Sequence, residues 1–165
     1  MGVRNLSGPL RSVWSAKLGG SPGRYITDRL NLEIEVPNQT RYLRLVGNIA
    51  EQVAKEVEAS NGDRDTLAYH LNLVLTEAVA NVIQHDAQSD PTNKVKVCLS
   101  IENKDLVARV YDHGQGFDLA AVPTLDFADL DEHGRGIFVI RSLMDSVEYR
   151  KTERGNVLEM RKRLA

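Results

Sequence analysis

The first regular pattern in the chain is an alternation of apolar and polar residues. Apolar side chains occupy every second position from Leu30 to Val36, and the pattern stops at Pro37. A period of two is typical of a half-buried strand, and proline cannot donate the next hydrogen bond of a strand ladder. The pattern therefore predicts a strand that ends at this proline.

Helical spacing replaces the alternation in the next segment. Apolar residues recur at intervals of three or four from Tyr42 to Val57. Asn38 precedes them as a residue able to cap a helix, and Asn61-Gly62 follows as a stop signal. We expect a helix here with one face committed to the core.

A second and longer apolar stripe follows, with Asp65 or Thr66 as the expected cap. It runs from Leu67 to Ile83 and predicts a helix that ends near Gln84. Beyond it, alternation predicts four further strands, one long loop and one short apolar helix. The Asn103-Lys104-Asp105 cluster predicts a hairpin turn between the first two of these strands, and Arg154-Gly155-Asn156 a turn between the last two. In chain order, we expect strands at 95–101 and 106–111, a loop at 113–134, a helix at 137–144, and strands at 146–151 and 157–163.

This order of elements predicts an α+β protein, a two-layer sandwich in which helices cover one face of a mixed, mostly antiparallel sheet. The length of 165 residues fits one domain. Residues 1–25 are rich in Gly, Ser and Arg without a sustained period, so we expect a flexible N-terminal arm followed by a domain over residues 26–165.

Charge and composition exclude several classes of function. The formal net charge is −2 and the two signs are interspersed, so no broad basic field favours direct nucleic-acid binding. No apolar run is long enough to cross a bilayer, and we expect a cytoplasmic protein without membrane contact. The single cysteine, Cys98, lies in an alternating apolar segment and is expected to be a buried, inert thiol.

Three polar residues in the second predicted helix share one stripe. Glu77, Asn81 and His85 are spaced by four in LTEAVANVIQHD. Because four residues nearly complete a helical turn, all three side chains project on the same side. An isolated stripe of this kind is often solvated, so it gains meaning only beside other signals.

Two glycine motifs supply those signals. In DHGQGFD, Asp112 ends a predicted strand, and Gly114 and Gly116 permit positive φ or a close approach to the backbone. In HGRGIFVIRSLMD, Gly134 and Gly136 precede an apolar helix, whose N-terminal N–H groups can receive phosphate oxygens.

In this order the three motifs resemble those of the GHKL ATPases, in which an E-x-x-x-N-x-x-x-H helix, a D-x-G-x-G turn and a G-x-G lid end enclose ATP. The resemblance covers roughly residues 30–163. Within that superfamily, TEAVANVIQHD, YDHGQGFD and GRGIFVIRSLMD look most like the anti-sigma-factor serine kinases of bacterial stress and sporulation switches.

The resemblance implies a role for each motif residue. Glu77 would be the general base and Asn81 the Mg²⁺ ligand, which suits an ion that accepts an amide oxygen while keeping waters. Asp112 would accept the adenine amino group, so ATP should be preferred over GTP. The remaining expected nucleotide contacts are His85, Gly114, Gly116, Gly134, Arg135 and Gly136.

Two positions depart from the family pattern. His133 stands where many relatives carry another glycine, and Asn156 follows Gly155 where a threonine is common near the adenine. Both departures bear on nucleotide affinity rather than on the fold.

The resemblance leaves more than one function open. The first is a homodimeric kinase that sequesters a sigma factor and phosphorylates a serine of an anti-sigma-factor antagonist. The second is a nucleotide-gated protein-binding regulator without kinase activity. The third, a histidine-kinase-like ATPase domain, is disfavoured because His70 and His85 lie on the same helix and no second helix pair carries a phosphoacceptor histidine.

Overall fold

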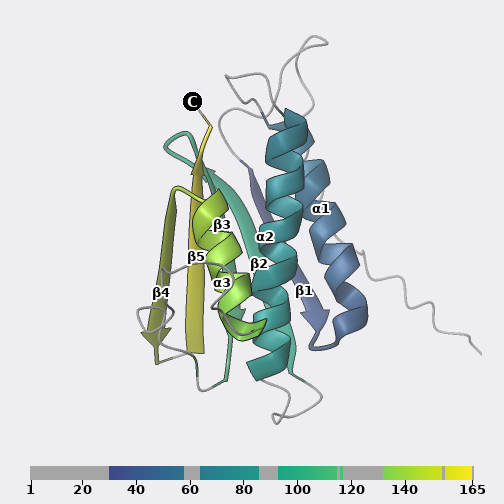
Figure 1. Ribbon diagram of the computed structural model, residues 1–165, viewed down its shortest axis with the longest axis vertical. Helices are drawn as coiled ribbons and strands as arrows, with labels where there is room; N and C mark the ends of the chain where they lie inside the picture. Colours follow the sequence, from purple (N-terminus) through teal and green to yellow (C-terminus); the bar gives the residue numbers. More distant parts are fainter. Residues whose placement is uncertain are drawn as a thin grey trace, which may run out of the picture.

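The computed structural model of the protein describes residues 30–57, 64–85, 93–114, 116, 132–153 and 155–164. These residues form one five-stranded sheet and three α-helices, and the helices all lie on one face of the sheet (Figure 1). The elements are β1 (Asn31–Pro37), the 3₁₀ turn η1 (Thr40–Tyr42), α1 (Leu43–Glu56), α2 (Arg64–His85), β2 (Lys94–Glu102), β3 (Asp105–Asp112), α3 (Glu132–Leu143), β4 (Ser146–Thr152) and β5 (Gly155–Arg163).

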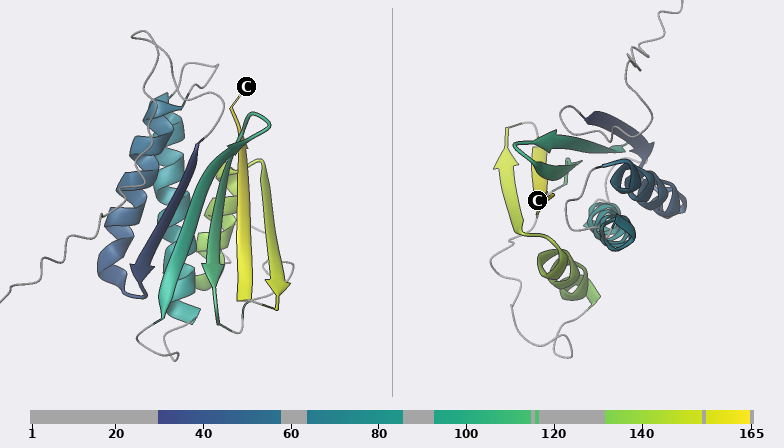
Figure 2. Two further views of the ribbon diagram at one scale, coloured as in Figure 1. Left: turned by 180° about the vertical axis from the view of Figure 1, so that it is seen from behind. Right: turned by 90° about the horizontal axis from the view of Figure 1, so that it is seen from above.

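The strands lie in the order β1-β2-β3-β5-β4, and every pairing between the described strands is antiparallel. In the view from behind, none of the described helices covers the other face of the sheet, here called the bare face (Figure 2). The expected α+β sandwich with helices on one face is therefore confirmed. The expected mixture of strand directions is not seen among the described strands.

Strand register places the apolar residues of neighbouring strands on the helix-facing side. Val110 lies opposite Val97 on β2 and opposite Leu158 on β5. Ala108 lies in the same way between Leu99 and Met160. All of these residues are buried in the core, which fixes the register because a slip by one residue would expose each of them.

The turn between β2 and β3 confirms the expected hairpin. Asn103 and Lys104 have φ of 54° and 70°. A two-residue turn with positive φ at both positions matches the right-handed twist of the strands that it joins. The predicted cluster at 103–105 therefore lies at the turn, with Asp105 as the first residue of β3.

Helices α1 and α2 pack against each other over a glycine. A Cβ on Gly47 would lie 2.6 Å from Oδ1 of Asn72 and 2.7 Å from Oγ1 of Thr76. The Asn72 amide in turn donates to Oε2 of Glu51 at 2.9 Å. The absence of a side chain at position 47 thus lets the two helices approach closely while polar groups of α2 remain paired.

The bare face of the sheet carries a network of charges centred on Glu159, which is 5% exposed. Arg109 and Arg161 each donate to this carboxylate through Nε, at 2.6 and 2.8 Å. Burial raises the pKa of Glu159, but the hydrogen bonds from the two arginines outweigh it and the net shift is downward. Arg109 also holds Glu102, and this hydrogen bond is the main cause that lowers the pKa of Glu102 to about 2.

Two local expectations are wrong. Asn38 does not cap the first helix, since Gln39 precedes η1 and Tyr42 precedes α1 at the capping positions. The backbone N–H of Asn38 instead donates to the Asn93 carbonyl at 3.1 Å and extends the β1–β2 pairing. Helix α1 begins later, at Leu43, after the 3₁₀ turn. The residues expected to cap the second helix, Asp65 and Thr66, instead lie in the first turn of α2.

The glycine pair predicted to precede the short helix lies within it. Helix α3 begins at Glu132, so Gly134 and Gly136 lie inside its first two turns. Both glycines are buried. Glycine is disfavoured inside helices, so local propensity predicts a loop for the pair, but at Gly136 a close approach to Glu77 and Asn81 of α2 outweighs that propensity.

The expected N-terminal arm, residues 1–25, lies outside the described residues and stays a prediction. So does most of the expected loop at 113–134. Among the helices that the structure describes, none is both long enough and apolar enough to span a membrane.

Candidate functional site

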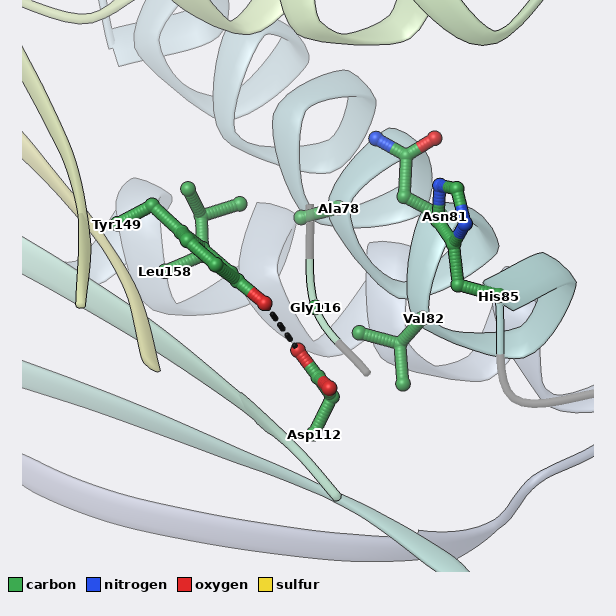
Figure 3. Close-up of a pocket in the computed structure, with 8 residues that line it drawn as sticks. All are labelled: Ala78, Asn81, Val82, His85, Asp112, Gly116, Tyr149 and Leu158. Atoms are coloured by element: carbon green, nitrogen blue, oxygen red, sulfur yellow. Dashed lines mark hydrogen bonds between the residues drawn. The ribbon is translucent and has the colours of Figure 1, made fainter. Parts of the chain in front are cut away.

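A recess lies between α2 and the ends of the central strands (Figure 3). It comprises about 290 Å³ of space not filled by protein atoms, open solvent included. Its walls are formed by Ala78, Asn81, Val82, His85, Asp112, Gly116, Tyr149 and Leu158.

Helix α2 contributes one wall of the recess through residues one turn apart. Asn81 and His85 project from the same side of the helix, as their spacing of four predicts (Figure 3). Asn81 is 7% exposed, and its Nδ2 is buried without a hydrogen-bond partner among the described residues. His85, one turn later, is exposed at the rim.

An unpaired buried amide costs roughly 1–3 kcal/mol, so proteins rarely keep one without a reason. The oxygen and nitrogen of an asparagine amide exchange places by rotation about its last bond, and their assignment follows from the surrounding hydrogen bonds. Asn81 can therefore present either atom to a ligand.

Helix α3 closes the site beside Asn81 through a glycine. A Cβ on Gly136 would lie 2.9 Å from Oε2 of Glu77 and 3.4 Å from both amide atoms of Asn81. The glycine thus leaves a small cradle in front of a carboxylate and an amide that sit one helical turn apart. The structure brings together the three residues that the sequence motifs predicted for the phosphate end of the site.

Asp112 occupies the other side of the recess, where β3 ends. It is 8% exposed and its carboxylate is surrounded by donors. Oδ1 accepts the backbone N–H of Gly114 at 2.9 Å and Nδ2 of Asn156 at 2.8 Å. Oδ2 accepts the hydroxyl of Tyr149 at 3.2 Å.

Two glycines with positive φ allow this arrangement. Gly116 has a φ of +71°, and a Cβ there would lie 2.5 Å from the Tyr149 hydroxyl. Gly155 has a φ of +120°, and its Cβ would lie 2.6 Å from the backbone oxygen of Asp112. Of the two glycines expected in the D-x-G-x-G turn, Gly116 is therefore needed for its backbone angle, whereas Gly114 contributes its N–H.

The remaining predicted residues lie in the first turn of α3. Gly134 is buried there and Arg135 is exposed. Neither lines the recess, so their predicted contact with nucleotide stays a prediction. The side chain of His133 lies outside the described part of the chain.

Two residues that contact Asp112 do not follow from the sequence motifs. The sequence predicts Tyr149 only as part of a strand and Asn156 only as a departure from threonine. Asn156 is 5% exposed and donates both to Asp112 and, at 2.9 Å, to the carbonyl of Gly114. Position 156 could have been found from the sequence, because a polar residue directly after a glycine turn faces the strand that ends in the D-x-G-x-G motif. Position 149 has no comparable feature in the sequence.

The donor set fits a nucleotide with Mg²⁺. Magnesium accepts amide and carboxylate oxygens and keeps several waters, so one amide beside a carboxylate is sufficient protein ligation when phosphates supply the rest. No group of three or more His, Cys, Asp or Glu side chains within the described residues is placed to hold a metal ion. Rotation of the Asn81 amide places its oxygen at the unpartnered Nδ2 position beside the Gly136 cradle, so Asn81 fits the role of magnesium ligand.

The two-layer α+β domain, the Asn/Glu helix, the buried strand-end aspartate and the glycine-lined recess match the arrangement that the sequence motifs predict for a nucleotide-binding domain. The family model described as "Histidine kinase-like ATPase domain" matches residues 36–162. The chain therefore belongs to the family of histidine kinase-like ATPase domains, which confirms the GHKL resemblance of its motifs.

Several characterised proteins are similar to the chain. The serine-protein kinase RsbW of Halalkalibacterium halodurans is 28% identical over 139 residues, 79% of this chain and 82% of that protein. The anti-sigma F factor of Anoxybacillus flavithermus is 30% identical over 99 residues, 57% of this chain and 68% of that protein. The RsbW name supports a kinase at the level of the family.

Among solved structures, the blue-light activated histidine kinase of Erythrobacter litoralis EL346 is 17% identical with a TM-score of 0.49. The match covers 78% of this chain and 42% of that one.

Proposed function

We propose that the protein binds ATP with Mg²⁺ in the recess between α2 and the sheet and transfers the γ-phosphate to a serine of a partner protein. The observation that carries this proposal is the Gly136 cradle, which faces both the Glu77 carboxylate and the unpartnered amide of Asn81. Asp112, at the opposite side of the recess, fits the role of adenine acceptor.

Each of these residues has a distinct task in the proposed reaction. Asn81 would hold Mg²⁺, which would neutralise phosphate charge, and the nucleotide would supply the phosphoryl group. Glu77 takes the proton of the serine hydroxyl as a general base. The rest of the phosphoryl transfer requires mainly positioning and charge neutralisation. Asp112 accepts the exocyclic amine of adenine and so favours ATP over GTP.

The names of the relatives supply the proposed partners. By similarity to the anti-sigma F factor and to the RsbW kinases, the protein would sequester a sigma factor and phosphorylate an anti-sigma-factor antagonist in the cytoplasm. A homodimer belongs to the same proposal. Leu45 on α1 is 48% exposed and is one apolar residue available for such a contact.

A second candidate is a nucleotide-gated regulator that binds partners without transferring phosphate. The name "Anti-sigma F factor" favours it, because that name refers to binding rather than to catalysis. Such gating requires different partner affinities in different nucleotide states.

One experiment separates the two candidates. The protein is incubated with Mg²⁺ and γ-labelled ATP together with proteins that it captures from a bacterial lysate, and the labelled residue is located. Label on a serine of a captured protein, lost in Glu77→Gln while ADP binding persists, supports the kinase. ATP binding without transfer supports the regulator, and absence of ATP binding contradicts both.

A further inference from the structure

Tyr149 reaches the recess from β4, the edge strand, and lies two strands away from the aspartate that it contacts. Its ring is half-buried and packs against the core. Figure 3 shows the ring beside Leu158 with the hydroxyl directed at Asp112. The tyrosine is thus part of the wall of the recess. It donates to Asp112, the one carboxylate among the residues that line the recess.

The hydrogen bonds of Asp112 define what the carboxylate can still accept. An ionised carboxylate offers about four lone-pair positions. Gly114 N–H and Asn156 Nδ2 occupy both positions of Oδ1, and the Tyr149 hydroxyl occupies one of Oδ2. Among the described residues, no further donor contacts this carboxylate, so one position on Oδ2 is left for a ligand.

Gly116 makes the tyrosine contact possible. A Cβ at this position would lie only 2.5 Å from the phenol oxygen, so any side chain would displace the hydroxyl from Asp112. The second glycine of the D-x-G-x-G turn therefore serves the tyrosine as well as the backbone. The aspartate, the turn and the edge strand act as one unit through this contact.

We propose that Tyr149 is a specificity-determining positioning residue. Its hydroxyl fixes the Asp112 carboxylate so that Oδ2 accepts a single donor from the bound base, which makes the site select a purine with an exocyclic amine. This inference rests on the proposed nucleotide function and deepens it. A carboxylate left free to rotate would accept the amine less well and would discriminate less between purines.

The test compares two diphosphates in the presence of Mg²⁺ by titration calorimetry. ADP carries the exocyclic amine, and purine riboside 5′-diphosphate lacks it. We expect the wild-type protein to prefer ADP by at least about tenfold. Tyr149→Phe keeps the ring and removes only the hydroxyl, and it should lower this preference at least about fivefold. The affinity for purine riboside diphosphate should stay within about twofold.

Tyr111→Phe is the matched control. Tyr111 is also half-buried but lies beside Asp112 in β3, where successive residues face opposite sides of the sheet, and it does not line the recess. Its variant should keep the full preference for ADP.

The outcomes are distinct. If Tyr149→Phe keeps the full preference for ADP, or increases it because the tyrosine competes with the base, the inference is overturned. The proposed nucleotide function is unaffected by that result. If the wild-type protein binds neither diphosphate, the proposed nucleotide function fails and the inference falls with it. Thermal unfolding of each variant checks that a lost preference does not reflect a lost fold.

Discussion

Gly136 lies so close to Glu77 that a Cβ on the glycine would come within 2.9 Å of the glutamate Oε2. The contact joins α3 to the polar stripe of α2, and the glycine lies inside a helix, where it carries a cost of roughly 0.5–1 kcal/mol relative to alanine. A glycine that lowers helix stability yet lies this close to a carboxylate and an amide indicates that the space a side chain would fill has a function. The glycine keeps that space open.

Gly136→Ala should therefore separate stability from function. The methyl group gains helix propensity and meets the far end of the flexible Glu77 side chain, so the unfolding temperature should stay the same or rise. The same methyl fills the cradle in front of Glu77 and Asn81, and affinity for Mg²⁺-ADP should fall at least about tenfold. Calorimetric titration and thermal unfolding measure the two effects.

Gly47→Ala is the matched control, because it also adds a methyl group to a helix. It meets two short side chains, Asn72 and Thr76, at the α1–α2 contact. Overpacking there should lower the free energy of unfolding by about 1 kcal/mol and leave nucleotide affinity unchanged. Equal loss of affinity in both alanine variants would contradict a specific role for the cradle.

Gly155→Ala should be the most destabilising of the glycine substitutions. Its φ of +120° is rarely adopted by any other residue, and the added Cβ would meet the backbone oxygen of Asp112 at 2.6 Å. Strain of this kind costs about 1–3 kcal/mol, and a backbone atom cannot move aside as a side-chain end can. Denaturant unfolding measures the loss. An unfolding free energy equal to that of Gly136→Ala would contradict the strain assigned to this turn.

Acid should weaken the charge network on the bare face of the sheet. The hydrogen bond from Arg109 lowers the pKa of Glu102 from 4.5 to about 2. A carboxyl whose pKa is lower in the folded state than in the unfolded state stabilises the fold at pH values above its unfolded-state pKa. This contribution is lost as the pH falls toward the folded-state pKa. The stability difference between wild type and Glu102→Gln should be largest above about pH 5 and should disappear between about pH 4.5 and about pH 2.

Denaturant unfolding across that pH range measures this difference. Glu35→Gln serves as the control, because Glu35 pairs with Lys94 at an exposed position where ion pairs contribute little. A difference for Glu102→Gln that does not depend on pH would contradict the role assigned to Arg109.

The alternation of apolar residues was enough to predict the sheet, because each strand buries one face. Val97 and Val110 follow the period of two and lie opposite each other in the core. Spacing by four likewise placed Asn81 and His85 on one wall of the recess. These features depend on local periodicity, which the sequence carries directly.

Tertiary contacts were beyond prediction from local pattern. Alternation places Tyr149 on the helix-facing side of a strand, but it does not reveal that the hydroxyl reaches Asp112 across β5. Local propensity predicts a loop for the glycines of α3 for the same reason, since Glu77 and Asn81, which Gly136 approaches, lie on a helix formed much earlier in the chain. Contacts between distant segments override local propensity at both places.

Equilibrium binding of ADP with and without Mg²⁺, for wild type and Asn81→Leu, tests the central claim most directly. The leucine removes a buried amide nitrogen that has no partner among the described residues, so the fold should be at least as stable. Asn48→Leu, on the exposed side of α1, is the control and should bind as the wild type does. The account predicts that wild type binds ADP at least about tenfold more tightly with Mg²⁺ and that Asn81→Leu loses this dependence. Absence of ADP binding by the wild-type protein, or an Mg²⁺ dependence that survives in Asn81→Leu, would contradict it.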